Sequence, residues 1–248
     1  MGSCSGYKRV TLATRCLLVL TCTHVCPIVR AAAETSRGGA TAMPHAVVRL
    51  YTDSGPLIGM LKEREDEVRD IMTGVPGFMS YGIMDTGKGA VSVTTCQDKA
   101  GTDESIQRAA RWIKENLPDA KIDPPRILEG EQVVRFNAEG LSTSARGDAH
   151  LVVRIFSGPP PDGLRDRMDE VRTLMTAVPG FRTYVVVDTG HGQGGVSFIV
   201  GKDRSVTDEV SRRMAEFVRS QWPDFKREPP QVIEAEGVFR FDAQAAPV

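Results

Sequence analysis

Apolar and polar residues follow two regular spacings along most of the chain after residue 44. Residues 45–51 (HAVVRLY) alternate with the period of two that a half-buried strand requires. From Leu57 to Val75, apolar residues recur every three or four positions, as in an amphipathic helix, and Pro76-Gly77 ends that helix. The same reasoning predicts a hairpin, a second helix with Thr102 as its N-cap, and a final strand. The predicted order is β-α-β-β-α-β, with strands at 45–51, 78–85, 91–96 and ending at 136.

The whole pattern occurs twice. HAVVRLY at 45–51 matches HLVVRIF at 150–156, and PPRILEGEQVVRF at 124–136 matches PPQVIEAEGVFRF at 229–241, both at an offset of 105 residues. Similarity at a fixed offset indicates two copies of one structural unit. We therefore divide the chain into a leader (1–44), copy 1 (45–137), a small polar linker (138–149), copy 2 (150–242) and a tail (243–248).

One copy alone leaves one face of its sheet uncovered. Two helices can cover only one side of a four-stranded antiparallel sheet, so the other side needs a partner. A second copy on the same chain supplies that partner at high effective concentration. We predict an α+β fold in which tandem ferredoxin-like β-α-β-β-α-β repeats pack sheet-to-sheet as a pseudo-dimeric α+β barrel.

A family resemblance rests on the segment after the first helix. VPGFMSY (75–81) and VPGFRTY (178–184), each before a DTG turn, resemble the dimeric α+β barrel superfamily that includes antibiotic-biosynthesis-monooxygenase-like proteins. The resemblance covers both copies. It implies a ferredoxin-like fold, barrel assembly, and a small-molecule pocket between helices and sheet or inside the barrel.

The resemblance leaves two classes of function open, because one fold serves many activities. The first is a small-molecule enzyme, a cofactor-independent monooxygenase-like protein acting on an electron-rich organic substrate. The second is a non-catalytic barrel that binds a ligand or partner, or has a structural role.

Composition excludes some partners. The chain has 248 residues, with 31 Lys and Arg against 32 Asp and Glu. A near-neutral chain lacks the basic surface that nucleic acid binding needs, so we expect no nucleic acid partner. No apolar run reaches the ~18 residues expected of a membrane span.

The leader has two interpretations. Lys8 and Arg9 precede a modest apolar stretch, and the small residues 31–33 would suit cleavage, so residues 1–44 resemble a secretory signal peptide and predict export. Arg15 interrupts the apolar run, however. The alternative is that translation starts at Met43, which predicts a cytoplasmic protein.

Polar residues on the strands are the candidates for chemistry. Val91 and Val93 are expected to face the helices, so that the alternate positions face the barrel interior. The polar residues expected there are His45, Arg49, Tyr51, Ser92 and Thr94 in copy 1, and His150, Arg154 and Ser197 in copy 2.

The two arginines are the main candidates. Arg49 and Arg154 would suit an anionic or quinone-like ligand, because a guanidinium group offers N–H donors in fixed geometry. The other interpretation is that each pairs with Asp or Glu across the barrel, the usual remedy for a buried charge.

Histidines and tyrosines extend the candidate set. His45 and His150 would act as a general base or a metal pair, or lie partly solvated at strand starts. Tyr81 and Tyr184 would donate a hydrogen bond into a pocket, or be structural.

We expect no metal and no cofactor. The four histidines lack the spacing of metal ligands, and the second helix has no histidine to bind haem iron. Residues 190–195 (GHGQGG) contain GxGxxG, but a dinucleotide site needs a helix after this motif, and here a strand follows. We interpret residues 190–195 as a hairpin tip.

Overall fold

The computed structural model describes residues 43–53, 55–120, 122–138, 144–146, 149–190 and 194–243. The predicted leader up to residue 42, most of the linker and residues 244–248 of the tail lie outside the described residues. So do residues 191–193 of the predicted hairpin tip. The boundaries of leader, copies, linker and tail therefore stay predictions.

Both copies show the predicted order of strands and helices. In copy 1 the elements are β1 (His45–Tyr51), α1 (Leu57–Glu63), α2 (Glu65–Thr73), β2 (Phe78–Asp85), β3 (Ala90–Cys96), α3 (Lys99–Asn116) and β4 (Arg126–Asn137). The short strand β5 (Ser144–Arg146) follows. In copy 2 they are β6 (His150–Ser157), the 3-10 helix η1 (Arg165–Arg167), α4 (Met168–Thr176), β7 (Phe181–Asp188), β8 (Gly194–Gly201), α5 (Arg204–Gln221) and β9 (Gln231–Asp242).

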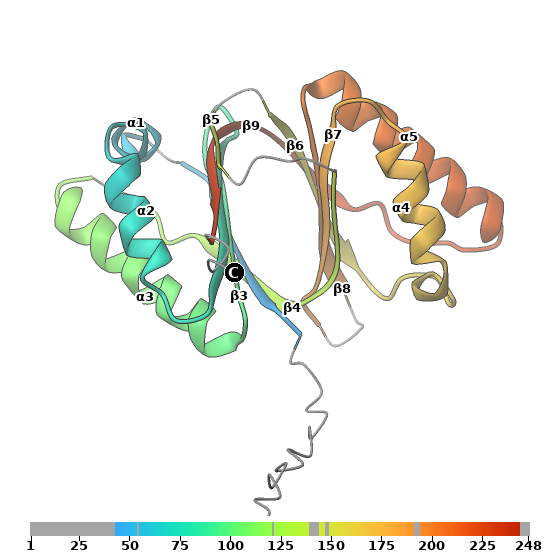
Figure 1. Ribbon diagram of the computed structural model, residues 1–248, viewed down its shortest axis with the longest axis horizontal. Helices are drawn as coiled ribbons and strands as arrows, with labels where there is room; N and C mark the ends of the chain where they lie inside the picture. The colour runs from blue at the N-terminus through green and yellow to red at the C-terminus, as the bar shows by residue number, and fades with distance from the viewer. Residues whose placement is uncertain are drawn as a thin grey trace, which may run out of the picture. The chain divides into compact units, whose positions relative to one another are not determined.

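The strands form one closed antiparallel sheet. Their order is β2-β3-β1-β4-β7-β8-β6-β9, a pairing of β9 with β2 closes the ring, and β5 adds to β9. Figure 1 shows α1, α2 and α3 on one flank of the barrel and α4 and α5 on the opposite flank. The predicted fold, a pseudo-dimeric α+β barrel, is confirmed.

Each copy gives the second half of its last strand to the other copy. β4 pairs first with β1 and then with β7, where Phe136 lies opposite Tyr184. β9 pairs first with β6 and then with β2, where Phe241 lies opposite Tyr81. Phe241 therefore belongs to the core under the helices of copy 1, and Phe136 to the core under the helices of copy 2.

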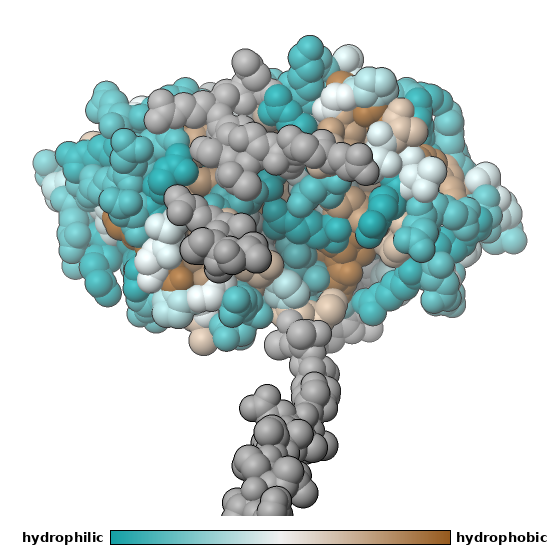
Figure 2. Space-filling view, in the orientation of Figure 1, coloured by the Kyte–Doolittle hydropathy of each residue, from teal (hydrophilic) through white to brown (hydrophobic). Residues whose placement is uncertain are grey.

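Three apolar clusters fill the described structure. Two of them lie under the helices, one in each copy. The outer faces of these helices are mainly hydrophilic (Figure 2). The third consists of strand side chains from both copies and fills the barrel interior. Its buried members are Ala46, Val48, Leu50, Val91, Leu151, Val153, Val185, Val187, Val196, Phe198 and Ala235.

The prediction of which strand face points inward was wrong. Val91 belongs to the barrel-interior cluster and Val93 packs against that cluster, although both were expected to face the helices. Arg49 and Ser92 line a space under the helices instead, and Arg49 hydrogen-bonds to Ser105 of α3. Alternation separates a strand into two sets of side chains. Because both faces of this sheet are buried, alternation alone does not say which set lies inside.

Two helices differ from their predicted bounds. The first breaks at Arg64, whose φ of −117° and ψ of 35° are not helical, so α1 and α2 are separate. The second begins before Thr102, because the N-cap is Asp98, whose side chain accepts a hydrogen bond from the backbone N–H of Gly101 at 2.9 Å. Asp203 caps α5 in the same way. Thr102 therefore lies in the first turn of α3, where its hydroxyl group contacts a histidine.

Candidate functional site

A small cavity lies between the sheet and the helices of copy 1. Its volume is about 30 Å³, which is room for one or two water molecules. Four side chains from the strands form its polar part: Arg49, Tyr51, Tyr81 and Ser92. The helices supply apolar walls that include Leu57 and Leu61 of α1, Met72 of α2, and Trp112 and Ile113 of α3.

Arg49 is the charged residue that lines this cavity, and it is deeply buried. It lies in the middle of β1, between Ser92 of β3 and Ile127 of β4, and its side chain is 2% exposed. One terminal nitrogen donates to Thr94 Oγ1 at 3.0 Å and the other to Ser105 Oγ at 2.8 Å. The third nitrogen, Nε, is buried and has no hydrogen-bond partner within the described structure.

The charge of Arg49 has no carboxylate partner among the described residues, in contrast to the ion pair that the sequence left open. Burial lowers the pKa of Arg49, and the groups that oppose this shift are Tyr51, Tyr81 and Cys96. All three are neutral at pH 7, since their ordinary pKa values already lie above 7. Burial raises the pKa of both phenols further and raises that of the Cys96 thiol to about 11. An arginine stays protonated in proteins, so the site holds an uncompensated positive charge.

The two phenols at the cavity are hydrogen-bonding groups rather than bases. Tyr51 and Tyr81 are 8% and 5% exposed, and burial is the main cause of their raised pKa values. The Tyr81 ring also packs on Phe241, with ring centroids 5.3 Å apart. The last strand of copy 2 therefore supports one wall of the site in copy 1.

The histidines connect the sheet to the second helix of each copy. His45 Nδ1 lies 2.7 Å from Thr102 Oγ1, and the Thr102 hydroxyl donates its only proton to the Lys99 carbonyl at 2.9 Å. The imidazole must therefore donate from Nδ1, which leaves Nε2 as the acceptor. His150 and Thr207 repeat this arrangement, also at 2.7 Å. Both histidines are buried rather than partly solvated, and neither lines the cavity.

Larger apolar side chains occupy the equivalent space in copy 2. Ile199 stands where copy 1 has Thr94, and Val210 stands where it has Ser105. Both are buried in the core under α4 and α5, and Met214, the counterpart of Ala109, packs against them. Tyr184 is buried in the same core, which raises its pKa to about 12. The hydroxyl groups that hold Arg49 thus have no counterparts in copy 2.

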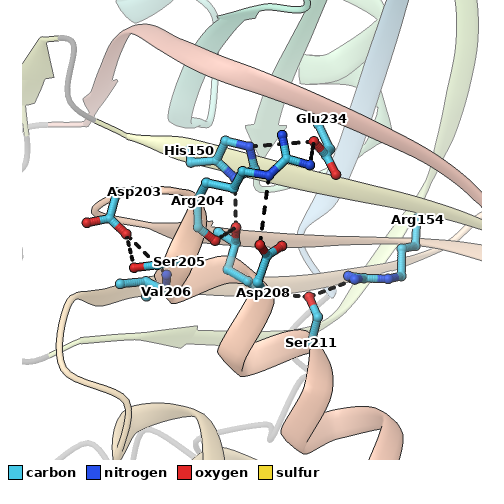
Figure 3. Close-up of polar contacts among 10 residues, drawn as sticks. His150, Arg154, Asp203, Arg204, Ser205, Val206, Asp208, Ser211 and Glu234 are labelled. Carbon is cyan, nitrogen blue, oxygen red and sulfur yellow. Dashed lines mark hydrogen bonds and ion pairs between the residues drawn. The ribbon is translucent and has the colours of Figure 1, made fainter.

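Arg154 therefore has different surroundings from Arg49. It donates one hydrogen bond, to Ser211 Oγ at 2.7 Å (Figure 3). Burial lowers the pKa of Arg154, and Tyr184, Asp208 and Glu234 oppose that shift. Two of these groups are carboxylates, but both form ion pairs with Arg204, Asp208 at 3.8 Å and Glu234 at 2.7 Å. Ser197 lies opposite Arg154 on β8 and is likewise outside the copy 1 cavity.

The structure thus brings together part of the predicted set and adds residues that sequence reasoning missed. Arg49, Tyr51, Tyr81 and Ser92 meet at one cavity, and Thr94 holds Arg49. Ser105 also holds Arg49 but was not predicted. Its only sequence signal is a polar residue one helical turn before Ala109 on the apolar face of α3. Trp112 also lines the cavity, and its Nε1 donates a hydrogen bond to Glu67 at 3.0 Å.

The described residues show neither a metal site nor a membrane-spanning helix. Within the described residues, no group of three or more His, Cys, Asp or Glu side chains could hold a metal ion. None of the helices in the described ranges is long and apolar enough to cross a membrane.

Comparison with known proteins gives structural relatives, while no protein-family model and no curated protein matches the chain. A proposed monooxygenase from Fusobacterium nucleatum has a TM-score of 0.60 at 13% identity, over 81% of this chain and 95% of that one. A proposed monooxygenase from Lactobacillus acidophilus has a TM-score of 0.55 at 11% identity, over 81% and 96%. A mutant chlorite dismutase from Candidatus Nitrospira defluvii has a TM-score of 0.52 at 8% identity, over 80% and 92%.

At these identities the likeness establishes the fold and leaves the substrate open. The closed eight-strand ring, with helices on both flanks, agrees with these relatives over most of their length. The chain thus shares its fold with these two proposed monooxygenases and this chlorite dismutase, as an α+β barrel with both halves on one polypeptide.

Proposed function

We propose that this protein is a monooxygenase-like enzyme that binds a small, electron-rich organic substrate in the copy 1 cavity and uses no bound cofactor. The observation that carries the proposal is the cavity itself, in which a polar end containing Arg49 meets apolar walls from three helices. This combination is typical of small-molecule sites, where a few polar groups fix orientation and apolar walls exclude water. The fold of two proposed monooxygenases supports it.

The proposed reaction requires a substrate that supplies its own electrons. When one O2 converts a CH2 group into C=O and forms one H2O, the substrate provides all four electrons. In this proposal the phenols of Tyr51 and Tyr81 orient the substrate by hydrogen bonds. Walls such as Leu61 and Ile113 keep bulk water away from the reacting carbon.

A screen tests this proposal directly. Polyphenols, quinones and haem would be added to the full chain, and binding would be detected by a rise in melting temperature. The reduced compounds that raise the melting temperature of the protein would then be tested for O2 consumption. We expect at least one polyphenol to stabilise the protein and to consume O2, and Ser92→Ala to weaken both effects.

Ser197→Ala is the matched control, because Ser197 holds the equivalent register position in copy 2. Equal effects of the two serine substitutions would contradict a site confined to copy 1. Stabilisation by haem, with O2 chemistry only in its presence, would contradict the cofactor-free reaction.

One observation favours the alternative, a barrel that binds a ligand without reaction. The cavity of about 30 Å³ is far below the roughly 300–1,000 Å³ of typical ligand pockets, so a substrate enters only if a wall moves. Stabilisation by ligands without O2 consumption would support this alternative.

A further inference from the structure

The strongest unexplained feature of the molecule is the buried positive charge of Arg49. A guanidinium group that is 2% exposed has lost nearly all its hydration. Two neutral hydroxyl groups, of Thr94 and Ser105, replace only part of that loss, and the buried Nε has no partner among the described residues. Burial of a charge is costly unless an opposite charge and further hydrogen bonds compensate it.

Other arginines that are largely covered do have carboxylate partners. Arg135 lies 3.7 Å from Asp242, and Arg240 lies 2.9 Å from the same carboxylate. The counterpart of Arg49 in copy 2, Arg154, hydrogen-bonds to Ser211, while the nearby Asp208 and Glu234 form ion pairs with Arg204 (Figure 3). Arg49 is flanked instead by two phenols and a thiol that are neutral at pH 7. Among the described residues, no carboxylate therefore balances the charge of Arg49.

The rest of the cavity restricts the chemistry of that partner. Beyond Arg49, Tyr51, Tyr81 and Ser92, the walls are almost entirely aliphatic or aromatic. A small inorganic anion would gain little from such walls, because it would give up its hydration to apolar surface. An organic acid would place its charged oxygens at Arg49 and bury its apolar body against the helices.

We infer that the copy 1 cavity binds a monovalent organic anion with an apolar body, whose charged oxygen accepts a hydrogen bond from Arg49 Nε. This inference rests on the proposed function, because it names the substrate class of the same cavity. A carboxylate and a phenolate or enolate share this chemistry. Each is a planar group whose negatively charged oxygen can accept a hydrogen bond from the planar guanidinium group.

Binding needs more space than the cavity has at present. α1 is the wall best placed to provide it, since Leu57 and Leu61 cover the cavity and α1 ends at the non-helical residue Arg64. Gly55, with φ of 40°, precedes α1. Copy 2 has the single 3-10 turn η1 before α4 instead of a separate α-helix.

The test compares an anion with a neutral molecule of the same shape. Benzoate and benzamide would be titrated into the full chain at pH 7, with affinity measured by calorimetry and by thermal shift. We expect benzoate to bind at least about 10-fold more tightly than benzamide, as loss of a charge-assisted hydrogen bond implies. We expect Arg49→Gln to abolish that preference and Arg49→Lys to retain part of it.

Arg154→Gln is the matched control and should keep the preference, because Arg154 lies outside the cavity lining. Urea unfolding of each variant would show that it is folded. A second arm would compare 2-naphthoate with 2-naphthol from pH 7 to pH 10. Preference for the first indicates a carboxylate ligand, and binding of the second that strengthens with ionisation indicates a phenolate.

Each of these results would overturn the inference: equal binding of benzoate and benzamide, retention of the preference in Arg49→Gln, or stabilisation by chloride or nitrate but not by benzoate. Absence of any anion effect would also overturn it. These failures are distinct from failure of the proposed function. A neutral substrate that consumes O2 refutes the inference alone, whereas a bound anion without O2 consumption refutes the enzyme alone.

Discussion

At the scale of single residues, Arg49 combines a folding cost with the binding role that we propose for it. Without a ligand, its buried charge lacks a carboxylate partner in the described structure. Replacing a poorly compensated buried charge by an apolar side chain of similar length is often stabilising. Arg49, which we assign to ligand binding, should therefore lower the free energy of unfolding of the ligand-free protein.

This gives the first prediction. Arg49→Met should raise the free energy of unfolding of the ligand-free protein by about 1–3 kcal/mol, because the uncompensated charge is removed. Urea unfolding at pH 7 measures it. Arg154→Met should give no such gain, since Asp208 and Glu234 already act on that charge. A clear loss of stability in Arg49→Met would show that the charge is satisfied in a way that the contacts of Arg49 do not reveal.

A second prediction concerns His45. Burial lowers the pKa of its imidazole below the ordinary value of 6.5, an effect that Glu129 opposes and Lys99 reinforces. Below pH 6.5 the unfolded chain therefore binds a proton more readily than the folded protein does. Stability from this group is complete above pH 6.5 and is lost as the pH falls through the pKa of the folded state.

Urea midpoints measured at intervals from pH 7.5 to pH 5 would show this loss. His45→Gln should flatten the dependence in that range, because the titrating group is gone. An unchanged slope in His45→Gln would assign the pH dependence to other groups.

At the scale of elements, the site depends on features that sequence spacing did not reveal. The repeated β-α-β-β-α-β pattern predicted the barrel, since each copy had an apolar sheet face to cover. The side of the sheet on which Arg49 lies was not predictable, because both sets of alternating side chains are buried. Ser105 was missed for a related reason: the partner of a polar side chain on an apolar helix face depends on tertiary contacts.

Helix boundaries show the same limit. Thr102 and Asp98 are both good N-cap residues, and the structure uses Asp98. The Thr102 hydroxyl then bonds to His45, which follows from the packing of β1 against α3. The crossing of β4 and β9 between copies was also not predicted, because a strand pattern does not name its neighbours.

The third prediction concerns α1, the seven-residue helix over the cavity. Its N-cap, Pro56, makes no side-chain hydrogen bond, and α1 is separated from α2 at Arg64. We expect backbone amides of α1 to exchange hydrogen at least about 10-fold faster than those of α2, as local opening of a weakly held element implies. Benzoate should slow exchange in α1, if that helix closes over the ligand.

Exchange followed by mass spectrometry of peptides measures these rates. α4, the counterpart of α2 in copy 2, is the internal control and should not respond to the ligand. Slow exchange throughout α1 in the free protein would contradict a moving wall there.

At the scale of the whole molecule, the two copies complete each other's cores. Phe241 is 1% exposed, and its ring contacts Phe78, Tyr81 and Phe239 under the helices of copy 1. Phe136 does the same in copy 2, against Tyr184. The halves are therefore not independent domains, even though their sequences repeat.

The fourth prediction follows from this exchange. Phe241→Ala should cost about 3–5 kcal/mol of unfolding free energy, the usual range for a buried phenylalanine. The loosening should appear in copy 1, as faster hydrogen exchange in α2 and α3, although Phe241 belongs to copy 2 in the sequence. Phe136→Ala should loosen α4 and α5 instead. Loosening confined to the mutated copy's own helices would contradict the strand exchange.

The exchanged strands also limit which substitutions one copy can accept without an effect on the other copy. In the described structure of copy 2, Ile199 and Val210 fill the space that corresponds to the copy 1 cavity. Copy 2 still cannot be deleted, because β9 supplies Phe239 and Phe241 to the half that keeps the cavity. A substitution in β9 can therefore change the walls of the copy 1 cavity, so neither copy can vary independently of the other.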